Sequence, residues 1–552
     1  MEHQLLALQA LFTEDQVAIL QVDDHFPFSD EQLARIGIVQ RNSEGKPQFI
    51  HRTFAEYLVA EFLTKELKKN TKQRKQVQDI LLNKVLLRSD CQVIRSFLDG
   101  FLEISKPTNE ALKEYGEELN KQLKEREDRG PLAGVTTALH TAAKDDNASI
   151  IEFLLESLKS GEDLNTVTEM LLATDRQGRT VLHKAAENNS IHALKKIWEW
   201  AGKVTTWKAA AERGHLVALS DHSEASDTNY TSPEGEEIQP NQIKNKLFVA
   251  KDKYGNMAWH TAAQRGSVKT LETLWSWAKE MKLNTNELLL AQNEEGNTAW
   301  QLAAQTGGLE ILQELRTWAK KLQLNRNELK NKLLLAKDQC GYTVWYQAAE
   351  SGNLEALETL WFLGMVSELM PDEMLLAQNE EGNTAWQVAT QRCHFEVLKK
   401  LWEWAKGEQI GVHELKDNLL LTTDQYGNTA WYRAAERGNL EALWSWAKEV
   451  ETDTDELKKN LLLAQDKQGE NAWNLAADRD HFEVLKKMLG WTKEIQMNSN
   501  ALIKEFLQTK DKYGYIAWHR AAQRGRLKTL EMLWGTAKVV DLKPDKLKNN
   551  FF

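Results

Sequence analysis

The chain has 552 residues, a formal net charge of −11 at pH 7 and 42% hydrophobic residues. This length exceeds what one compact core holds, and the acidic balance argues against a nucleic-acid partner. Three separated cysteines without a CxxC pair indicate a reducing compartment. We find no signal peptide and no apolar run of 18 residues, so we expect a soluble cytoplasmic protein that does not enter a membrane.

The N-terminal segment predicts a hairpin followed by a helix. Residues 36–41 and 48–52 are short β-prone runs, and residues 42–47 between them have turn chemistry. The stretch Thr53-Phe-Ala-Glu56 fits a capping box that opens an apolar helix.

Residues 1–66 resemble the winged-helix end of NACHT-type NTPases, in which the helix commonly starts Phe-x-His-x-Thr-Phe, here Phe49-Ile-His51-Arg-Thr53-Phe54. The resemblance implies a vestigial nucleotide contact for His51; the alternative is a hairpin histidine that orders the start of the helix. The sequence has no GxxxxGK[ST] phosphate loop, because Pro47 follows Gly45-Lys46. We therefore expect no NTP hydrolysis by this chain.

Residues 67–130 have a helical pattern and predict a helical connector. The stretch 110–129 within it is strongly charged. We interpret it as a solvated connecting helix.

A repeat dominates the rest of the chain. Glycines before a stretch like Thr-Ala-Trp are spaced alternately 41–42 and 45 residues apart from Gly255 to Gly514. A fixed period of this size is typical of a stacked array. The alternation indicates two kinds of unit that were duplicated together as a pair of about 86 residues. The stretches around Gly341 and Gly427, residues 338–357 and 424–443, are nearly identical in sequence.

Each unit predicts a turn, a helix, a glycine break and a second helix. In residues 424–443, Asp424 and Gly427 suit a type I turn, Thr429 suits a helix N-cap, and Gly438 suits a helix end. The units are longer than the roughly 33 residues of a common two-helix repeat. The additional residues follow the second helix, as in residues 327–336, and predict a short extra helix or an extended second helix. One unit lacks three residues before Trp444, so we expect its second helix to be shortened or locally distorted.

These features resemble the ankyrin repeat over residues 131–540. Gly178-Arg-Thr-Val-Leu-His183-Lys-Ala-Ala186 is closest to the family signature, whereas later units replace Pro-Leu-His with Ala-Trp-x. The resemblance implies a mostly α fold, an ankyrin-type α-solenoid with elongated, paired repeats, preceded by the small winged-helix-like and helical region. Because a stacked unit buries its apolar face against neighbours, we expect the signature tryptophans to be core residues: Trp259, Trp300, Trp345, Trp386, Trp431, Trp473 and Trp518.

Two regions depart from the repeat. At about residues 204–246 we expect a degenerate unit that keeps its first helix from Thr206 but has lost its turn, followed by a polar insert over residues 220–242. Residues 541–552 are expected to be a C-terminal tail.

No catalytic or metal-binding constellation occurs in the sequence. We expect no enzyme activity, no cofactor, no metal, and no membrane or nucleic-acid partner. We expect a monomer that binds other proteins as a scaffold through the concave face of the ankyrin array. The candidate contacts are turn-tip residues and residues of the first helix expected to be exposed. The turn-tip set is Tyr254, Glu295, Cys340, Glu381, Tyr426, Gln468 and Tyr513; the helix set is Thr261, Leu302, Gln347, Val388, Arg433, Leu475 and Arg520.

Two alternatives remain open for the function. In the first, the chain is the sensor part of a NACHT–ankyrin receptor, of innate-immune type, whose NTPase core lies outside this sequence. In the second, it is a regulatory subunit of another enzyme.

Overall fold

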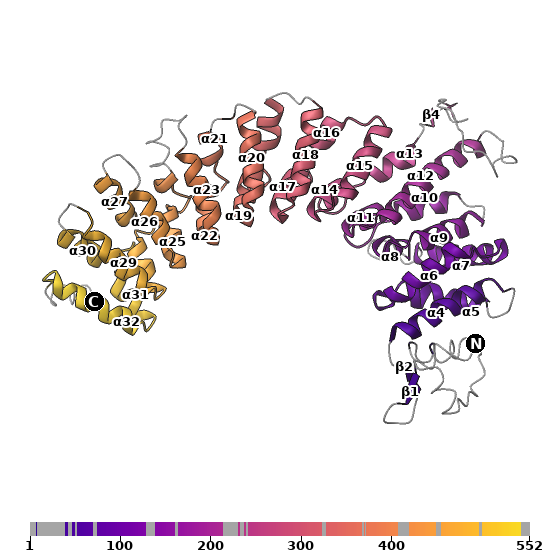
Figure 1. Ribbon diagram of the computed structural model, residues 1–552, viewed down its shortest axis with the longest axis horizontal. Coiled ribbons are helices and arrows are strands. Elements are labelled where there is room, and N and C mark those ends of the chain that lie inside the picture. Colours follow the sequence, from indigo (N-terminus) through magenta and orange to yellow (C-terminus); the bar gives the residue numbers. More distant parts are fainter. Residues whose placement is uncertain are drawn as a thin grey trace. The chain divides into compact units, whose positions relative to one another are not determined.

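The computed structural model describes residues 7, 11, 39–41, 47–49, 52–69, 74–127, 138–160, 164–212, 230–231, 237–238, 241–322, 327–366, 369, 371–406, 419–448, 454–495 and 499–542. The chain divides into unit 1, residues 1–285, and unit 2, residues 286–552. Both units are mainly helical (Figure 1). None of the described helices is long and apolar enough to span a membrane.

Unit 1 begins with a small hairpin and continues as stacked helices. Strand β1 pairs antiparallel with β2, with Val39 opposite Phe49. The elements in order are β1 (Val39–Arg41), β2 (Pro47–Phe49), α4 (Arg52–Leu67), α5 (Arg74–Ile80), η1 (Leu81–Leu86), η2 (Ser89–Cys91), α6 (Gln92–Ile104), α7 (Asn109–Glu127), α8 (Ala138–Lys144), α9 (Ala148–Ser160), α10 (Leu164–Leu172), α11 (Val181–Glu187), α12 (Ile191–Glu212), β3 (Tyr230–Thr231), β4 (Glu237–Ile238), α13 (Gln242–Val249), α14 (Ala258–Gln264), α15 (Val268–Glu280) and, at the boundary, α16 (Thr285–Leu289).

Unit 2 repeats one helical module. Its elements are α17 (Ala299–Thr306), α18 (Leu309–Lys321), η3 (Glu328–Leu334), α19 (Val344–Ser351), α20 (Leu354–Val366), α21 (Pro371–Leu375), α22 (Ala385–Arg392), α23 (Phe395–Ala405), α25 (Ala430–Arg437), α26 (Glu441–Lys448), α27 (Thr454–Leu463), α28 (Ala472–Asp478), α29 (Phe482–Thr492), α30 (Ser499–Gln508), α31 (Ala517–Gln523) and α32 (Leu527–Val539).

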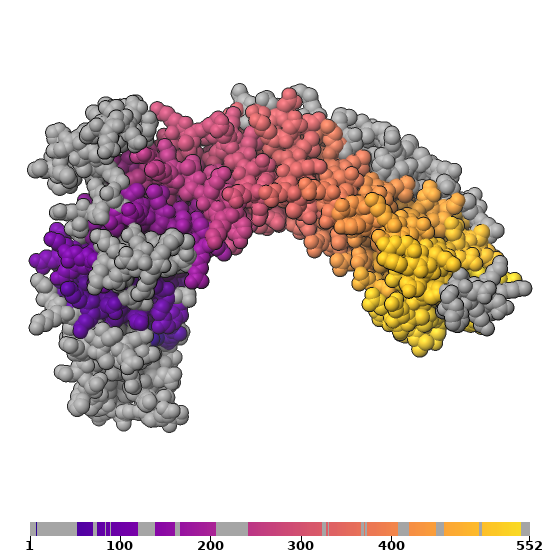
Figure 2. Space-filling model, turned by 180° about the vertical axis from the view of Figure 1, so that it is seen from behind, coloured from indigo at the N-terminus to yellow at the C-terminus, as the bar shows by residue number. Residues whose placement is uncertain are grey.

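Within unit 2 the first helices of consecutive repeats contact each other from α17 through α19, α22, α25 and α28 to α31. The second helices α18, α20 and α23 form a parallel row (Figure 1). From the side shown in Figure 2, the side chains of consecutive repeats pack without a gap. The α-solenoid predicted from the repeat is therefore confirmed.

Two local predictions for the repeat are also confirmed. The Thr429 hydroxyl accepts the Tyr432 N–H at 3.2 Å, as expected for an N-cap. The surplus residues form third helices such as α21, α27 and α30, and the predicted segment at 327–336 contains the short π-helical element η3. In the unit with three fewer residues, the second helix α26 is described from Glu441 to Lys448; the residues that follow lie outside the described part of the chain, so its shortening stays a prediction.

The hairpin predicted near the N-terminus is confirmed by β1 and β2. The following helix begins at Arg52, one residue before the predicted cap, and Arg52 pairs with Glu56 at 2.9 Å. His51 lies outside the described residues.

The charged helix α7 is not a solvated connector. Its residues Ala111 and Tyr115 are buried, and the Tyr115 ring lies 5.0 Å from the Phe153 ring of α9. A Cβ on Gly116 would lie 2.0 Å from the Ser157 carbonyl oxygen, so glycine is required for this close approach. The interpretation missed a narrow apolar stripe within a charged sequence.

The expected degenerate repeat is not a layer of the stack. Residues 206–212 continue helix α12, because no turn or cap ends that helix beforehand. The turn before α11 instead pairs directly with the turn before α14, through the Lys253 N–H and the Gln177 carbonyl at 2.9 Å. Within the predicted polar insert, the described residues of β3 and β4 pair antiparallel.

The signature tryptophans form the core, as predicted. All seven are buried. Trp345 lies against Trp361 of its own repeat and Trp404 of the next, and Trp361 stacks on Trp404 with ring centroids 4.6 Å apart. Trp386 and Trp431 make equivalent three-ring clusters. Such aromatic pairs contribute about 0.5–1.5 kcal/mol beyond their buried area.

In several repeats a polar side chain at the next signature position forms a hydrogen bond with the following repeat. His140 Nε2 lies 3.0 Å from the Arg179 carbonyl, and His183 Nε2 lies 2.8 Å from the Asn256 carbonyl. In unit 2, Gln301 Nε2 donates to the Tyr342 carbonyl at 2.9 Å. Histidine and glutamine therefore make the same bond in different repeats.

We expect acid to weaken unit 1 through these histidines. Burial lowers the pKa of His140 to about 4 and also lowers that of His183. An unfolded histidine titrates near pH 6.5, so the unfolded chain binds the proton first and stability falls as the pH drops from about 6.5 towards 4. Replacing both residues by glutamine should leave the inter-repeat bonds in place and remove part of this loss.

Hydrogen exchange of α8 and α11 at pH 7.5 and pH 5, read by mass spectrometry, checks this expectation. The matched control is Gln301→His with Gln387→His, which should make α17 and α22 more acid-sensitive. Equal acid sensitivity of the wild-type and glutamine variants in α8 and α11 would contradict it.

The tryptophan clusters predict a graded cost of substitution. Trp345→Ala should destabilise unit 2 by about 3–5 kcal/mol, the usual cost of emptying a buried aromatic site. Trp345→Phe should cost less than half as much, because the buried Trp345 indole N–H has no hydrogen-bond partner in the described part of the chain.

Urea unfolding measures both changes. The control is Phe362→Ala on the same repeat, since that ring is exposed and its loss should cost about 1 kcal/mol or less. An alanine variant no less stable than the control would show that the tryptophan clusters do not hold the repeats together.

Candidate functional site

Each described turn is held by its own aspartate or asparagine. Asp424 Oδ1 accepts the N–H groups of Tyr426 at 2.9 Å and Asn428 at 2.8 Å, and the Gly427 N–H donates to the Asp424 carbonyl at 2.9 Å. The same side-chain bonds recur at the other turns with aspartate, namely Asp175, Asp252, Asp338, Asp466 and Asp511. These bonds fix the backbone of the tip.

Backbone bonds then join consecutive turns. In unit 2 the Gln339 N–H donates to the Glu295 carbonyl at 2.8 Å, and the Lys467 N–H donates to the Tyr426 carbonyl at 2.8 Å. Equivalent bonds join the other turns of unit 2 to their neighbours. We call this row of tips the turn ladder; in unit 2 it comprises Glu295, Cys340, Glu381, Tyr426, Gln468 and Tyr513.

The turns approach too closely for a side chain at the ladder glycines. Gly341 has φ +76°, and a Cβ there would lie 2.6 Å from the Glu380 nitrogen. Both the left-handed backbone and the close contact therefore require glycine. The tips consequently lie on a backbone framework rather than on free loops.

The predicted tip residues are exposed. Tyr254 in unit 1 is 51% exposed, and Tyr426 and Tyr513 in unit 2 are 52% and 65% exposed. The remaining tips Glu295, Cys340, Glu381 and Gln468 are also exposed. Large side chains on a fixed backbone lose little conformational freedom on binding, which suits them to contact a partner.

The predicted helix set is not exposed, which is a correction. Thr261, Leu302, Gln347, Val388 and Leu475 are buried, and Arg433 and Arg520 are half-buried. The prediction assumed that this side of the first helix faces solvent. It faces the turn of its own repeat and the neighbouring repeat instead.

In three repeats the residue at this helix position pairs with the turn aspartate of its own repeat. Arg433 Nη2 lies 2.7 Å from Asp424 Oδ2, Arg520 Nη2 lies 2.6 Å from Asp511 Oδ2, and Gln347 Nε2 donates to Asp338 Oδ2 at 2.9 Å. Where the turn residue is Asn293 or Asn379, the helix residue is the apolar Leu302 or Val388. Arg433, Arg520 and Gln347 thus each bond to a turn within the chain.

Sequence reasoning missed a second row of residues beside the ladder. The rings of Tyr342 and Tyr346 stack with centroids 4.5 Å apart. The Tyr432 hydroxyl donates to Glu470 Oε2 at 3.0 Å, and burial raises the pKa of both groups. The available signal was the replacement of the signature histidine by tyrosine at Tyr346 and Tyr432.

Ion pairs cross from repeat to repeat along the ends of the first helices. Arg392 pairs with Glu350 at 2.7 Å, and Arg479 pairs with Glu436 at 3.1 Å. In unit 1, Arg265 pairs with Glu187 at 2.7 Å. These arginines are more than half exposed, so each pair adds little to stability and can reorganise against a partner.

Charge is segregated along the ladder of unit 2. The turns before α17 and α22 carry two exposed glutamates each, Glu294 with Glu295 and Glu380 with Glu381. The turns before α28 and α31 carry the exposed Lys467 and Lys512, and Lys512 Nζ lies 4.9 Å from the centre of the Tyr513 ring. One end of the ladder is therefore acidic and the other end is basic and aromatic.

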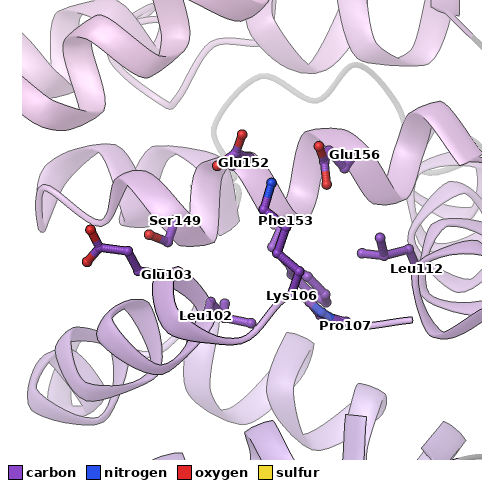
Figure 3. A pocket seen from close by; sticks show the side chains of 9 residues that line it. All are labelled: Leu102, Glu103, Lys106, Pro107, Leu112, Ser149, Glu152, Phe153 and Glu156. Carbon is purple, nitrogen blue, oxygen red and sulfur yellow. The ribbon is translucent and has the colours of Figure 1, made fainter. Parts of the chain in front are cut away.

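A shallow depression lies elsewhere, in unit 1 between α6, α7 and α9 (Figure 3). It is open to solvent and is lined by Glu103, Lys106, Ser149 and Glu152, among others. In the described residues no hydrogen bond links the Ser149 hydroxyl to a base, so the depression lacks an activated nucleophile. Nor does the described part of the chain place three metal-binding side chains together.

Comparison with known proteins supports the repeat assignment. A family model for ankyrin repeats (3 copies) matches residues 109–205, starting at the first residue of α7. A solved structure of the ankyrin repeat domain of Bcl-3, a unique member of the IkappaB protein family, matches at 17% identity over 50% of this chain and 98% of that chain, with a TM-score of 0.33. No curated protein matches the sequence. The family model therefore identifies ankyrin repeats in residues 109–205, and the α-solenoid fold rests on the stacked helix pairs of the structure itself.

Proposed function

We propose that the chain is a non-enzymatic scaffold that binds other proteins through its turn ladders and the helix ends beside them. The supporting observation is that exposed tyrosine and charged tips stand on a backbone fixed by hydrogen bonds within and between repeats. Ankyrin repeats are typically protein-interaction modules, which agrees with this use. The proposal includes a monomeric, cytoplasmic protein without a nucleic-acid partner.

The charge pattern narrows the kind of partner expected at unit 2. An extended partner segment would place basic residues near Glu294, Glu295, Glu380 and Glu381, and acidic residues near Lys467 and Lys512. Such complementary charges set orientation and speed association more than they add affinity. Binding should therefore weaken as salt rises.

Removing the two exposed tyrosines of the unit 2 ladder tests this function. Tyr426→Ala with Tyr513→Ala should lower recovery of native partners at least about tenfold, because exposed aromatic anchors carry much of an interface's energy. Folding should be unaffected, since both rings point away from the core. Tyr254→Ala tests the turn in unit 1 separately.

Affinity capture from native extract with quantitative mass spectrometry provides the readout. The matched control is Phe362→Ala with Met365→Ala, which removes two exposed apolar side chains from α20, away from the turns and the first-helix ends. Unchanged partner recovery with both tyrosine sets removed would refute the ladder as the binding surface.

A second candidate role is the sensor part of a nucleotide-switched NACHT-type receptor whose NTPase core lies outside this sequence. The antiparallel β1–β2 hairpin directly before α4 favours it, as the arrangement expected at the end of a winged helix. Sequencing the transcript upstream of Met1 tests it: an open reading frame with a phosphate loop supports the role, and a stop codon directly upstream contradicts it. A regulatory subunit of an enzyme would instead co-purify with that activity.

A further inference from the structure

One turn of unit 2 lacks the cation that its near-identical counterpart has. The repeats that begin at Asp338 and Asp424 differ at few positions, and one of them places Gln347 where the other has Arg433. Arg433 Nη2 lies 2.7 Å from the turn carboxylate Asp424 Oδ2. The described partners of the Asp338 carboxylate are N–H groups of its own turn and the Gln347 amide, and Asp338 is half-buried whereas Asp424 is buried.

A third repeat shows where the missing guanidinium group belongs. There Arg520 Nη2 lies 2.6 Å from the turn carboxylate Asp511 Oδ2, and the guanidinium carbon lies 5.6 Å from the centre of the Tyr515 ring. By sequence position, Asp338 corresponds to Asp511 and Tyr342 corresponds to Tyr515. The Asp338 repeat therefore keeps the carboxylate and the ring that hold this guanidinium, and it has lost the arginine.

Gln347 replaces only part of what the arginine supplies. Its Nε2 donates to Asp338 Oδ2 at 2.9 Å and to Asn297 Oδ1 at 3.0 Å, so the amide points at the turn. The side chain is 3% exposed, and its Oε1 has no hydrogen-bond partner in the described part of the chain. Burial raises the pKa of Asp338, because the amide brings no positive charge to offset it. A buried acceptor and a carboxylate without a cation are both stabilised by a positively charged donor.

Tyr342 provides an aromatic surface for such a donor. Its ring stacks on the Tyr346 ring with centroids 4.5 Å apart and planes 10° apart, which fixes its orientation. Tyr342 is half-buried, so part of the residue remains accessible. A guanidinium is planar, stacks on aromatic rings and donates to a carboxylate in a fixed fork, whereas an ammonium is a compact and strongly hydrated charge. The combination of Tyr342 and Asp338 therefore favours arginine over lysine.

Carboxylates flank this place on both sides. Backbone hydrogen bonds join the turn of Asp338 to the turns that carry Glu295 and Glu381. Asn297 Nδ2 donates to Glu295 Oε2 at 3.3 Å, and Asn383 Nδ2 donates to Glu381 Oε2 at 3.2 Å, so each tip carboxylate is held by its own turn. Within the described residues neither carboxylate is paired with a cation.

Two cations lie nearby, and both are engaged. Arg392 pairs with Glu350 at 2.7 Å, and Lys337 Nζ donates to a backbone carbonyl of the following repeat at 2.7 Å. The Asp424 repeat has a further arginine, Arg437, where the Asp338 repeat has Ser351. The surface around Asp338 therefore keeps an excess of negative charge that its counterpart lacks.

We propose that Asp338, Tyr342 and the flanking tip glutamates form a subsite of the turn ladder that binds an arginine side chain of the partner protein. The guanidinium takes the place that Arg520 fills in its own repeat, where it donates to the Asp338 carboxylate and lies against the Tyr342 ring. This assignment rests on the proposed scaffold function, and it fixes the basic residue expected near Glu295 as an arginine.

The exposed thiol of Cys340, in the same turn, allows the subsite to be probed without a known partner. The full chain is equilibrated in a thiol buffer with three small disulfides whose arms end in a guanidinium, an ammonium or a hydroxyl group. Mass spectrometry with peptide mapping measures how much of each arm Cys340 retains. The guanidinium arm should exceed the hydroxyl arm about tenfold, as expected for hydrogen bonds to a charged group. It should exceed the ammonium arm about threefold through the ring contact.

Substitutions exchanged between the two similar repeats provide the controls. Gln347→Arg supplies the guanidinium from within the chain, as Arg433 does, and should abolish the preference while keeping the fold. Tyr342→Asn introduces the residue of the Asp424 repeat and should remove the preference for guanidinium over ammonium. A cysteine placed by Tyr426→Cys should show no such preference, and adding Asn428→Tyr with Arg433→Gln should create it.

Equal retention of the guanidinium and ammonium arms at Cys340, or a preference that Gln347→Arg leaves in place, would overturn the subsite. In affinity capture from native extract, Gln347→Arg should lower partner recovery about threefold, the effect of one exposed ion pair. Unchanged recovery with Gln347→Arg, together with loss of recovery on Tyr426→Ala with Tyr513→Ala, would refute the subsite and leave the scaffold function standing. The disulfide measurement needs no partner, so failure of the scaffold function is distinguishable from failure of the subsite.

Discussion

The structure depends on one constraint: a repeat of two short helices buries its apolar face only when a neighbouring repeat covers it. The tryptophan clusters show this dependence, because Trp345 completes its contacts with Trp404 from the next repeat. A single repeat would leave these rings in water. The stabilising energy therefore lies between repeats, as in other solenoids, and it decreases wherever a neighbour is absent.

The same stacking positions the surface available for binding. Once the helices are in register, the turns lie close enough for the Gln339 N–H to reach the Glu295 carbonyl, and the aspartates hold each tip in shape. The exposed tyrosines of unit 2 are thus placed by the core and not by the loops that carry them. Rigid presentation of this kind is what gives repeat proteins extended binding surfaces.

Much of this architecture could be predicted from the sequence. The period, the turn residues and the glycine breaks gave the order of helices, and the fixed spacing of Trp300, Trp386 and Trp473 indicated burial. Exposure of the tips followed from their place in a turn. The turn and cap residues act locally, and the buried tryptophans recur at a fixed spacing. Both features can be recognised in a single sequence.

Other features depend on contacts that a period does not reveal. Arg433 and Arg520 looked like exposed anchors, but they pair with turn aspartates nine residues earlier. The direct pairing of Lys253 with Gln177 skips a segment that resembles a repeat in sequence, because helix α12 continues through it.

The most direct test of the account is the hydrogen-exchange rate of individual ladder amides in unit 2. The N–H groups of Gln339, Glu380, Lys467 and Lys512 donate to the preceding turn, so they should exchange at rates close to those of the first helices. Exchange of the ladder amides as slow as that of the first helices would show that the stacked helices and the turn ladder form together. Exchange at the rate of unstructured loops, while the first helices remain protected, would contradict the claim that the shared core fixes the tips.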